Sequence, residues 1–193
     1  MLNRDHFKLV LVISVAISSL TFFQHAAADK LIESCNQCHD NVKPDIPAIN
    51  GVSAFALETS MLAYVDNSRI ARPYEGEDMK TILTKLSEED FKKVLEHYSS
   101  QAFTPIKQEF NPELADKGKA VHEAYCSRCH TEGGSLAEDD SGILAGQWKG
   151  YLIEEMKNYK NGTRLGDKKM IDTIKPLSDE HINALAEYYA SQQ

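Results

Sequence analysis

Positive charge, cysteine and long apolar segments are scarce in this sequence of 193 residues. The 21 Lys and Arg residues are outnumbered by 29 Asp and Glu, and the resulting net charge of −8 excludes nucleic acid as a partner. No glycine-rich fingerprint of a dinucleotide-binding domain follows a predicted strand. The main apolar run, residues 9–23, is shorter than the ~20 residues that span a bilayer, so we expect no membrane span in the mature chain.

The apolar run lies in a segment with the layout of a cleavable secretory signal. Arg4 and Lys8 precede it, and three alanines at residues 26–28 follow it. We therefore expect residues 1–28 to be a signal peptide and the mature chain to begin at Asp29 in the periplasm; an uncleaved anchor is the alternative. An oxidising compartment outside the cytoplasm also suits the cysteines described next.

All four cysteines belong to two copies of one motif. Cys-x-x-Cys-His stands at residues 35–39 and again, 91 residues later, at residues 126–130. Two thiols on one helical turn can each form a thioether with a haem vinyl group, and the adjacent His can then bind the iron. The sequence predicts two covalent haem c groups and leaves no cysteine for a disulfide. The attachment residues are Cys35, Cys38, Cys126 and Cys129, and the iron ligands are His39 and His130.

A zinc site of four cysteines and a pair of thioredoxin-like redox sites are the alternatives. Both leave unexplained the His that follows each cysteine pair. They also leave unexplained a methionine that stands 40 residues after that His in each copy, Met79 and Met170. Haem c accounts for both features.

The repeat extends beyond the haem motif, so the chain is predicted to be a tandem duplication. Tyr98 matches Tyr189, and Ser87 and Ser178 are matching N-caps of closing helices expected at residues 88–100 and 179–192. Apolar stripes at helical spacing follow Gly51 and Gly146. We expect an all-α protein with two small class I cytochrome c domains, residues 29–101 and 113–193, joined by a linker at 102–112.

Two features of the connecting segments are predicted. The second copy has four extra residues in the polar stretch 132–142. The first copy has four extra residues between Gly51 and Met79, so the distance from His to Met is the same in both copies. Phe103 and Phe110 indicate that the linker packs across a domain interface.

The second axial ligand of each iron is predicted to be Met79 or Met170. Met61 and Met156 also match between the copies, but they lie within the apolar stripes, where methionine usually fills a core. Three histidines of the mature chain are further alternatives, and none is repeated at the 91-residue displacement; they are His97, His122 and His181.

Each axial imidazole needs an acceptor for its other ring nitrogen. We expect the carbonyl of Pro47 in the first copy and that of Gly142 in the second, with the flexible Gly142 holding its histidine less firmly. His and Met together leave the iron no open position, which favours electron transfer over chemistry on a substrate. A di-haem peroxidase in which one methionine dissociates is the enzymatic alternative.

These motifs resemble those of class I, tandem di-haem cytochromes c. From Pro105 onward the sequence is more specifically similar to the cytochrome subunit of flavocytochrome c sulfide dehydrogenase, and the first repeat resembles it more loosely. That subunit also lacks the proline that the wider di-haem family has at the place of Gly142. The segments that carry the resemblance are 105–110, 114–118, 125–130, 132–134, 143–148, 151–152, 168–170 and 189–193.

The resemblance implies a partner, an FAD-binding subunit that oxidises sulfide and passes electrons singly to the haems. The haems would then reduce a soluble acceptor protein, and this chain by itself would be no enzyme. A free-standing di-haem carrier to a terminal oxidase is the alternative. The acidic residues are spread through both halves, as on solvated helix faces; a docking patch for a basic redox partner is the other interpretation.

Overall fold

A computed structural model describes residues 30–40 and 43–193. The predicted signal peptide, residues 1–28, lies outside the described residues. Among the described residues, the structure divides into two units, residues 30–37 and residues 38–40 with 43–193. The predicted domain boundaries stay predictions.

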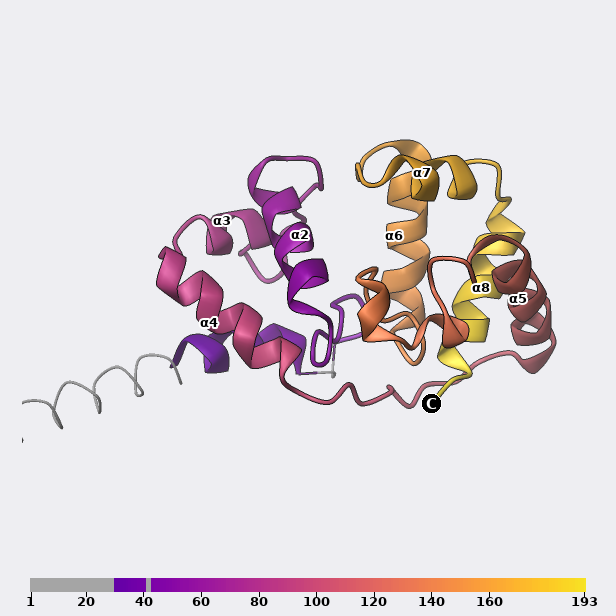
Figure 1. The fold of residues 1–193 in the computed structure, drawn as a ribbon, viewed down its shortest axis with the longest axis horizontal. Coiled ribbons are helices and arrows are strands. Elements are labelled where there is room, and N and C mark those ends of the chain that lie inside the picture. Colours follow the sequence, from indigo (N-terminus) through magenta and orange to yellow (C-terminus); the bar gives the residue numbers. More distant parts are fainter. Residues whose placement is uncertain (1–29, 41–42) are drawn as a thin grey trace, which may run out of the picture. The chain divides into compact units, whose positions relative to one another are not determined.

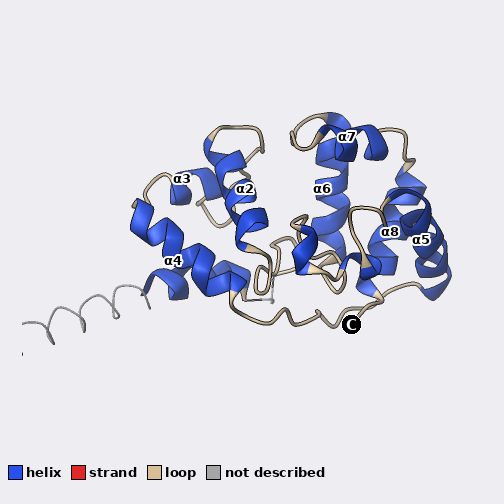
Figure 2. Ribbon diagram, in the orientation of Figure 1, coloured by secondary structure: helices blue, strands red, loops and turns tan. Residues whose placement is uncertain are grey.

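Helices are the only extended regular elements in the described part of the chain, which confirms the predicted all-α class (Figures 1 and 2). Residues 30–39 are helical. They are followed by α2 (Ala54–Val65), α3 (Met79–Leu83), α4 (Glu88–Ser99), α5 (Pro112–Tyr125), η1 (Glu132–Gly134), η2 (Ala137–Asp139), α6 (Lys149–Asn161), α7 (Lys168–Ile174) and α8 (Asp179–Ala190). Between the helices, the described residues form two isolated β-bridges, Arg69 with Arg164 and Tyr74 with Glu77.

The closing helices α4 and α8 begin where the sequence predicts. The side chains of Ser87 and Ser178 accept hydrogen bonds from the amides of Asp90 and His181. The helices end one and two residues before the predicted ends. Two short helices were not predicted: α3 and α7, which begin after the N-caps Asp78 and Asp167.

The core of the second repeat is formed by α6, α7 and α8, and α5 lies alongside α8 (Figure 1). At Gly118 of α5, an added Cβ would stand 1.9 Å from the carbonyl oxygen of Ala184, so only glycine permits this approach. The buried cluster consists of Leu152, Met156, Ile174, Leu177, Ile182, Leu185, Ala186 and Tyr189. None of the described helices is long and apolar enough to cross a bilayer.

The linker packs against the glycine that opens each apolar stripe. An added Cβ on Gly51 would meet the backbone of Phe103 at 2.6 Å, and the amide of Ile106 donates to the carbonyl of Gly146 at 2.8 Å. Ile106 is buried whereas Phe110 is exposed. The linker therefore contacts both glycines, through Phe103 and Ile106, and its packing across a domain interface stays a prediction.

Candidate haem sites

The first haem motif lies in the helix over residues 30–39, and its histidine is held by a backbone carbonyl. His39 Nδ1 is 2.8 Å from the oxygen of Pro47, which confirms the predicted partner. Because a carbonyl only accepts, Nδ1 carries the proton and donates it. Burial, and then the charge of nearby Arg69, lower the pKa of His39, so its imidazole is neutral and its Nε2 lone pair is available to iron.

The second motif follows α5, whose last residue is Tyr125. The amides of Cys129 and His130 both donate to the carbonyl of Cys126, at 3.1 and 3.0 Å, so the two thiols share one turn. His130 is buried, and burial lowers its pKa to about 4. A neutral imidazole again suits a metal ligand.

His130 is oriented by a side chain, and the prediction that Gly142 supplies a carbonyl is wrong. His130 Nδ1 is 3.1 Å from Ser141 Oγ. That hydroxyl donates its proton to the carbonyl of Cys129 at 2.9 Å, so it accepts from His130. The backbone turns through positive φ at Asp140 (55°) and Gly142 (77°), and the Ser141 hydroxyl takes the place of the carbonyl.

The four methionines of the two repeats fall into two environments. Met61 and Met156 are buried in the helical cores, as expected of core residues. Met79 is the first residue of α3 and Met170 the third of α7, and both are half-buried. Met170 packs against the same apolar cluster as Cys126, so the structure brings these two predicted site residues to one core. Ligation by Met79 and Met170 stays a prediction.

The three alternative histidines all have structural partners. His122 is buried in α5, with Nδ1 3.0 Å from the hydroxyl of Tyr189. His181 completes the capping box of α8, and the ring of His97 packs edge-on against Tyr98. Each role is one of packing or capping.

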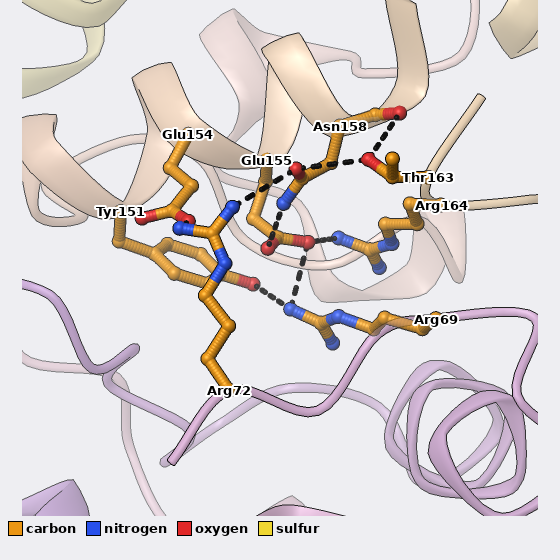
Figure 3. Close-up of polar contacts among 8 residues, drawn as sticks. All are labelled: Arg69, Arg72, Tyr151, Glu154, Glu155, Asn158, Thr163 and Arg164. Carbon is orange, nitrogen blue, oxygen red and sulfur yellow. Dashed lines mark hydrogen bonds and ion pairs between the residues drawn. The ribbon is translucent and has the colours of Figure 1, made fainter. Parts of the chain in front are cut away.

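A polar cluster joins segments of the two repeats (Figure 3). Arg69 from the first repeat and Arg164 from the second both pair with Glu155, with 2.8 Å between Arg69 Nη2 and Glu155 Oε2. The guanidinium groups of Arg69 and Arg164 stack over Tyr64 and Tyr159, each 4.4 Å from the ring centre. Arg72 pairs with Glu154 at the edge of the cluster.

This cluster was not predicted from the sequence, although the repeat contains a signal for it. In each copy the tyrosine stands 13 residues and the arginine 18 residues after the glycine at 51 or 146. The two arginines are thus related by the duplication, and they meet at the β-bridge between Arg69 and Arg164.

Two buried donors have no partner within the described chain: Arg69 Nε in the cluster and Trp148 Nε1 at the N-cap of α6. The cluster contains three arginines and two glutamates, so it holds a spare positive charge. The unpaired N–H of Arg69, buried beside spare positive charge, fits a carboxylate such as a haem propionate. By contrast, the described residues include no group of three or more His, Cys, Asp or Glu that would hold zinc.

Comparisons with known proteins find similar c-type cytochromes. The family model "Cytochrome C oxidase, cbb3-type, subunit III" matches residues 113–188. Cytochrome c4 of Azotobacter vinelandii is 33% identical over 87 residues, which cover 41% of this chain and 40% of that protein. The match therefore spans about two-fifths of this relative's length.

Solved structures extend the similarity to most of the chain. Reduced recombinant cytochrome c4 from Pseudomonas stutzeri superposes with a TM-score of 0.72 at 22% identity, over 87% of this chain and 98% of that one. The "as isolated" form of thiosulfate dehydrogenase (TsdBA) from Marichromatium purpuratum gives 0.71 at 23% identity, over 82% of this chain and 36% of that one.

The fold and the paired motifs define a di-haem c-type cytochrome with class I folds. Haem c is its cofactor, attached covalently at two sites. Its sequence is similar to that of a cytochrome c4 over 87 residues, and its fold is similar to that of solved cytochromes c4 over most of the chain.

Proposed function

We propose that the chain is a periplasmic electron carrier with two six-coordinate haems. In this proposal the thioethers form at Cys35, Cys38, Cys126 and Cys129, and the axial pairs are His39 with Met79 and His130 with Met170. The observation that carries the proposal is that both imidazoles are fixed by a hydrogen bond at Nδ1, which leaves Nε2 of each free for iron. An iron closed by such a histidine and a thioether exchanges electrons without binding a substrate.

Spectroscopy of the purified holoprotein tests this closed ligation. We expect a sulfur-to-iron charge-transfer band equal to two Met-ligated haems, unchanged by cyanide or peroxide. A haem that binds either reagent would overturn the proposal in favour of a peroxidase-like enzyme.

For the electron donor, we propose an FAD-binding subunit that oxidises sulfide. The support is the resemblance of residues 105–193 to the cytochrome subunit of such an enzyme. The structural similarity to a thiosulfate dehydrogenase also supports a donor that oxidises an inorganic sulfur compound. The similarity to cytochromes c4 favours the alternative, a free-standing carrier to a terminal oxidase or another respiratory acceptor.

Purification from the native source distinguishes the subunit of a flavoprotein complex from the free-standing carrier. Co-purification of a flavoprotein and rapid haem reduction on addition of sulfide are expected for the subunit. A flavin-free monomer that sulfide does not reduce, but that a respiratory donor complex does, would establish the free-standing carrier instead.

A further inference from the structure

The side chain of Gln147 connects the second repeat to the loop that holds His39. It is 2% exposed, and both of its amide atoms bond the same residue of the first repeat. Oε1 accepts from the amide of Ala48 at 3.0 Å, and Nε2 donates to the carbonyl of Ala48 at 2.9 Å. Oε1 also accepts from the amide of Trp148 at 3.1 Å, so the orientation of the side-chain amide is fixed.

Ala48 follows the residue that orients His39. The carbonyl of Pro47 and the amide of Ala48 are the two ends of one planar, conjugated peptide unit. A bond accepted from the Ala48 N–H polarises this unit and makes the Pro47 oxygen a stronger acceptor, because successive hydrogen bonds reinforce one another. The stronger acceptor draws the proton of His39 Nδ1 more firmly, which makes the imidazole a better electron donor to a metal.

We infer that Gln147 is a positioning residue which, from the second repeat, lowers the reduction potential of the haem bound by His39. The inference rests on the proposed ligation of that haem by His39. A more electron-rich imidazole stabilises the oxidised iron relative to the reduced iron, so the sign of the effect is a lower potential.

The device acts on one haem because the duplication does not repeat it. The residue that matches Gln147 in the first repeat is Val52, which has no polar side chain, and the residue that matches Ala48 is Ile143. His130 instead bonds a hydroxyl within its own repeat. Gln147 therefore acts on the haem of His39 and not on the haem of His130.

The test is a redox titration of the holoprotein with Gln147→Met, which keeps the side-chain volume and removes both bonds to Ala48. Each haem is followed by NMR through the signals of its own axial methionine. We call the haem bound by His39 haem 1 and that bound by His130 haem 2. We expect the ratio of reduced to oxidised haem 1, at a fixed potential, to rise about threefold, equal to a shift of about 30 mV for a one-electron couple. Haem 2 should shift far less.

Gln108→Met is the matched control, because Gln108 bonds the backbone carbonyl of Gln147 and the amide of Lys149 but not Ala48. It should leave haem 1 unshifted. Gln147→Glu, which keeps an acceptor for the Ala48 amide, should place the haem 1 potential at or below the native value. A rise with Gln147→Glu, or equal shifts of both haems in Gln147→Met, would indicate a loosened interface and overturn the inference.

The absorption spectrum separates this inference from the proposed function. If the charge-transfer band stays intact in Gln147→Met and the potential does not move, the inference fails while the ligation stands. Were the native protein to lack that band, the ligation itself would fail.

Discussion

The loops that orient the two axial histidines differ in length and in the group they offer. Gly51 stands 12 positions after His39, whose acceptor is the backbone carbonyl of Pro47. Gly146 stands 16 positions after His130, whose acceptor is the hydroxyl of Ser141. The short loop is tied to the other repeat through Gln147.

The long loop is held mainly by bonds within itself. Thr131 donates to the carboxylate of Asp139 from its amide at 2.6 Å and from its hydroxyl at 2.9 Å. Ser53 of the first repeat also donates to Asp140, at 2.7 Å. Both histidines thus have an acceptor at Nδ1. In the first repeat it is a backbone carbonyl in a loop that bonds the second repeat, and in the second repeat it is a side chain in a loop held mainly by its own hydrogen bonds.

The largest effect on this comparison is expected from removing one axial thioether. Met170→Ala should abolish half of the sulfur-to-iron charge-transfer band and lower the potential of haem 2, on the order of 100 mV, because a thioether favours reduced iron. Met79→Ala should do the same to haem 1 alone. Absorption spectra and redox titration measure both.

Met61→Leu and Met156→Leu are the controls, because these methionines are core residues and leucine conserves volume. Both should keep the full band. An intact band in Met170→Ala would transfer the ligand role to Met156 or to a histidine.

A second large effect is expected at the arginines that the duplication relates. Arg69→Met should lower the free energy of unfolding by about 3 kcal/mol, because it removes one partner of a buried ion pair with Glu155. Arg164→Met should lower the free energy of unfolding by less, since Arg164 is more exposed than Arg69. In that variant Glu155 keeps its pair with the more buried Arg69. Denaturant unfolding of the holoproteins measures the difference.

Arg72→Met supplies the surface reference for that pair of variants. Arg72 is exposed and pairs with Glu154, so its loss should cost under about 1 kcal/mol. Equal costs at Arg69, Arg72 and Arg164 would show that burial at the repeat contact does not distinguish these ion pairs.

Local patterns account for what the sequence predicts well. The N-caps Ser87 and Ser178, the all-α class and the carbonyl of Pro47 follow from short-range chemistry and from a rigid proline. Short helices such as α3 lack a full period of apolar residues, so periodicity does not reveal them.

Long-range contacts account for what the sequence does not predict. Gln147 bonds Ala48, which stands 99 positions earlier in the sequence. A single glutamine belongs to no sequence pattern from which such a partner could be predicted. The acceptor for His130 is the Ser141 hydroxyl and not the predicted Gly142 carbonyl, because backbone turns with positive φ decide which group faces the imidazole. Only the paired arginines left a readable signal, their equal distances from Gly51 and Gly146.

An intermediate effect is expected from Ser141→Ala, which removes the acceptor of His130. The corresponding acceptor of the first repeat is a backbone carbonyl, which a side-chain substitution would not remove. The Nδ1–H of His130 would be left buried without its partner, at a cost of about 1–3 kcal/mol in unfolding free energy. The potential of haem 2 should rise because the imidazole becomes a poorer donor, and haem 1 should not move. Redox titration followed by NMR checks both; Ser127→Ala, which removes an exposed hydroxyl bonded to the carbonyl of Glu123, is the control.

The smallest effect concerns pH and the tyrosines beneath the two arginines. Burial raises the pKa of Tyr64 to about 12, although Arg69 lowers it. Between about pH 10 and 12 the unfolded chain loses this proton first, so it binds fewer protons than the folded chain, and stability falls as pH rises. The loss that Tyr64 contributes should reach about 1 kcal/mol at pH 11.

Tyr64→Phe removes that contribution. From pH 9 to pH 11 the unfolding free energy of this variant should therefore decrease by about 1 kcal/mol less than that of the native protein. Tyr125→Phe, at an exposed tyrosine, controls for loss of a phenol. Burial also raises the pKa of Tyr159, so Tyr159→Phe should change the pH dependence in the same direction. If only one of the two tyrosines does so, the stacked pairs are not energetically equivalent, and the difference between the repeats extends from the histidine loops to the polar cluster.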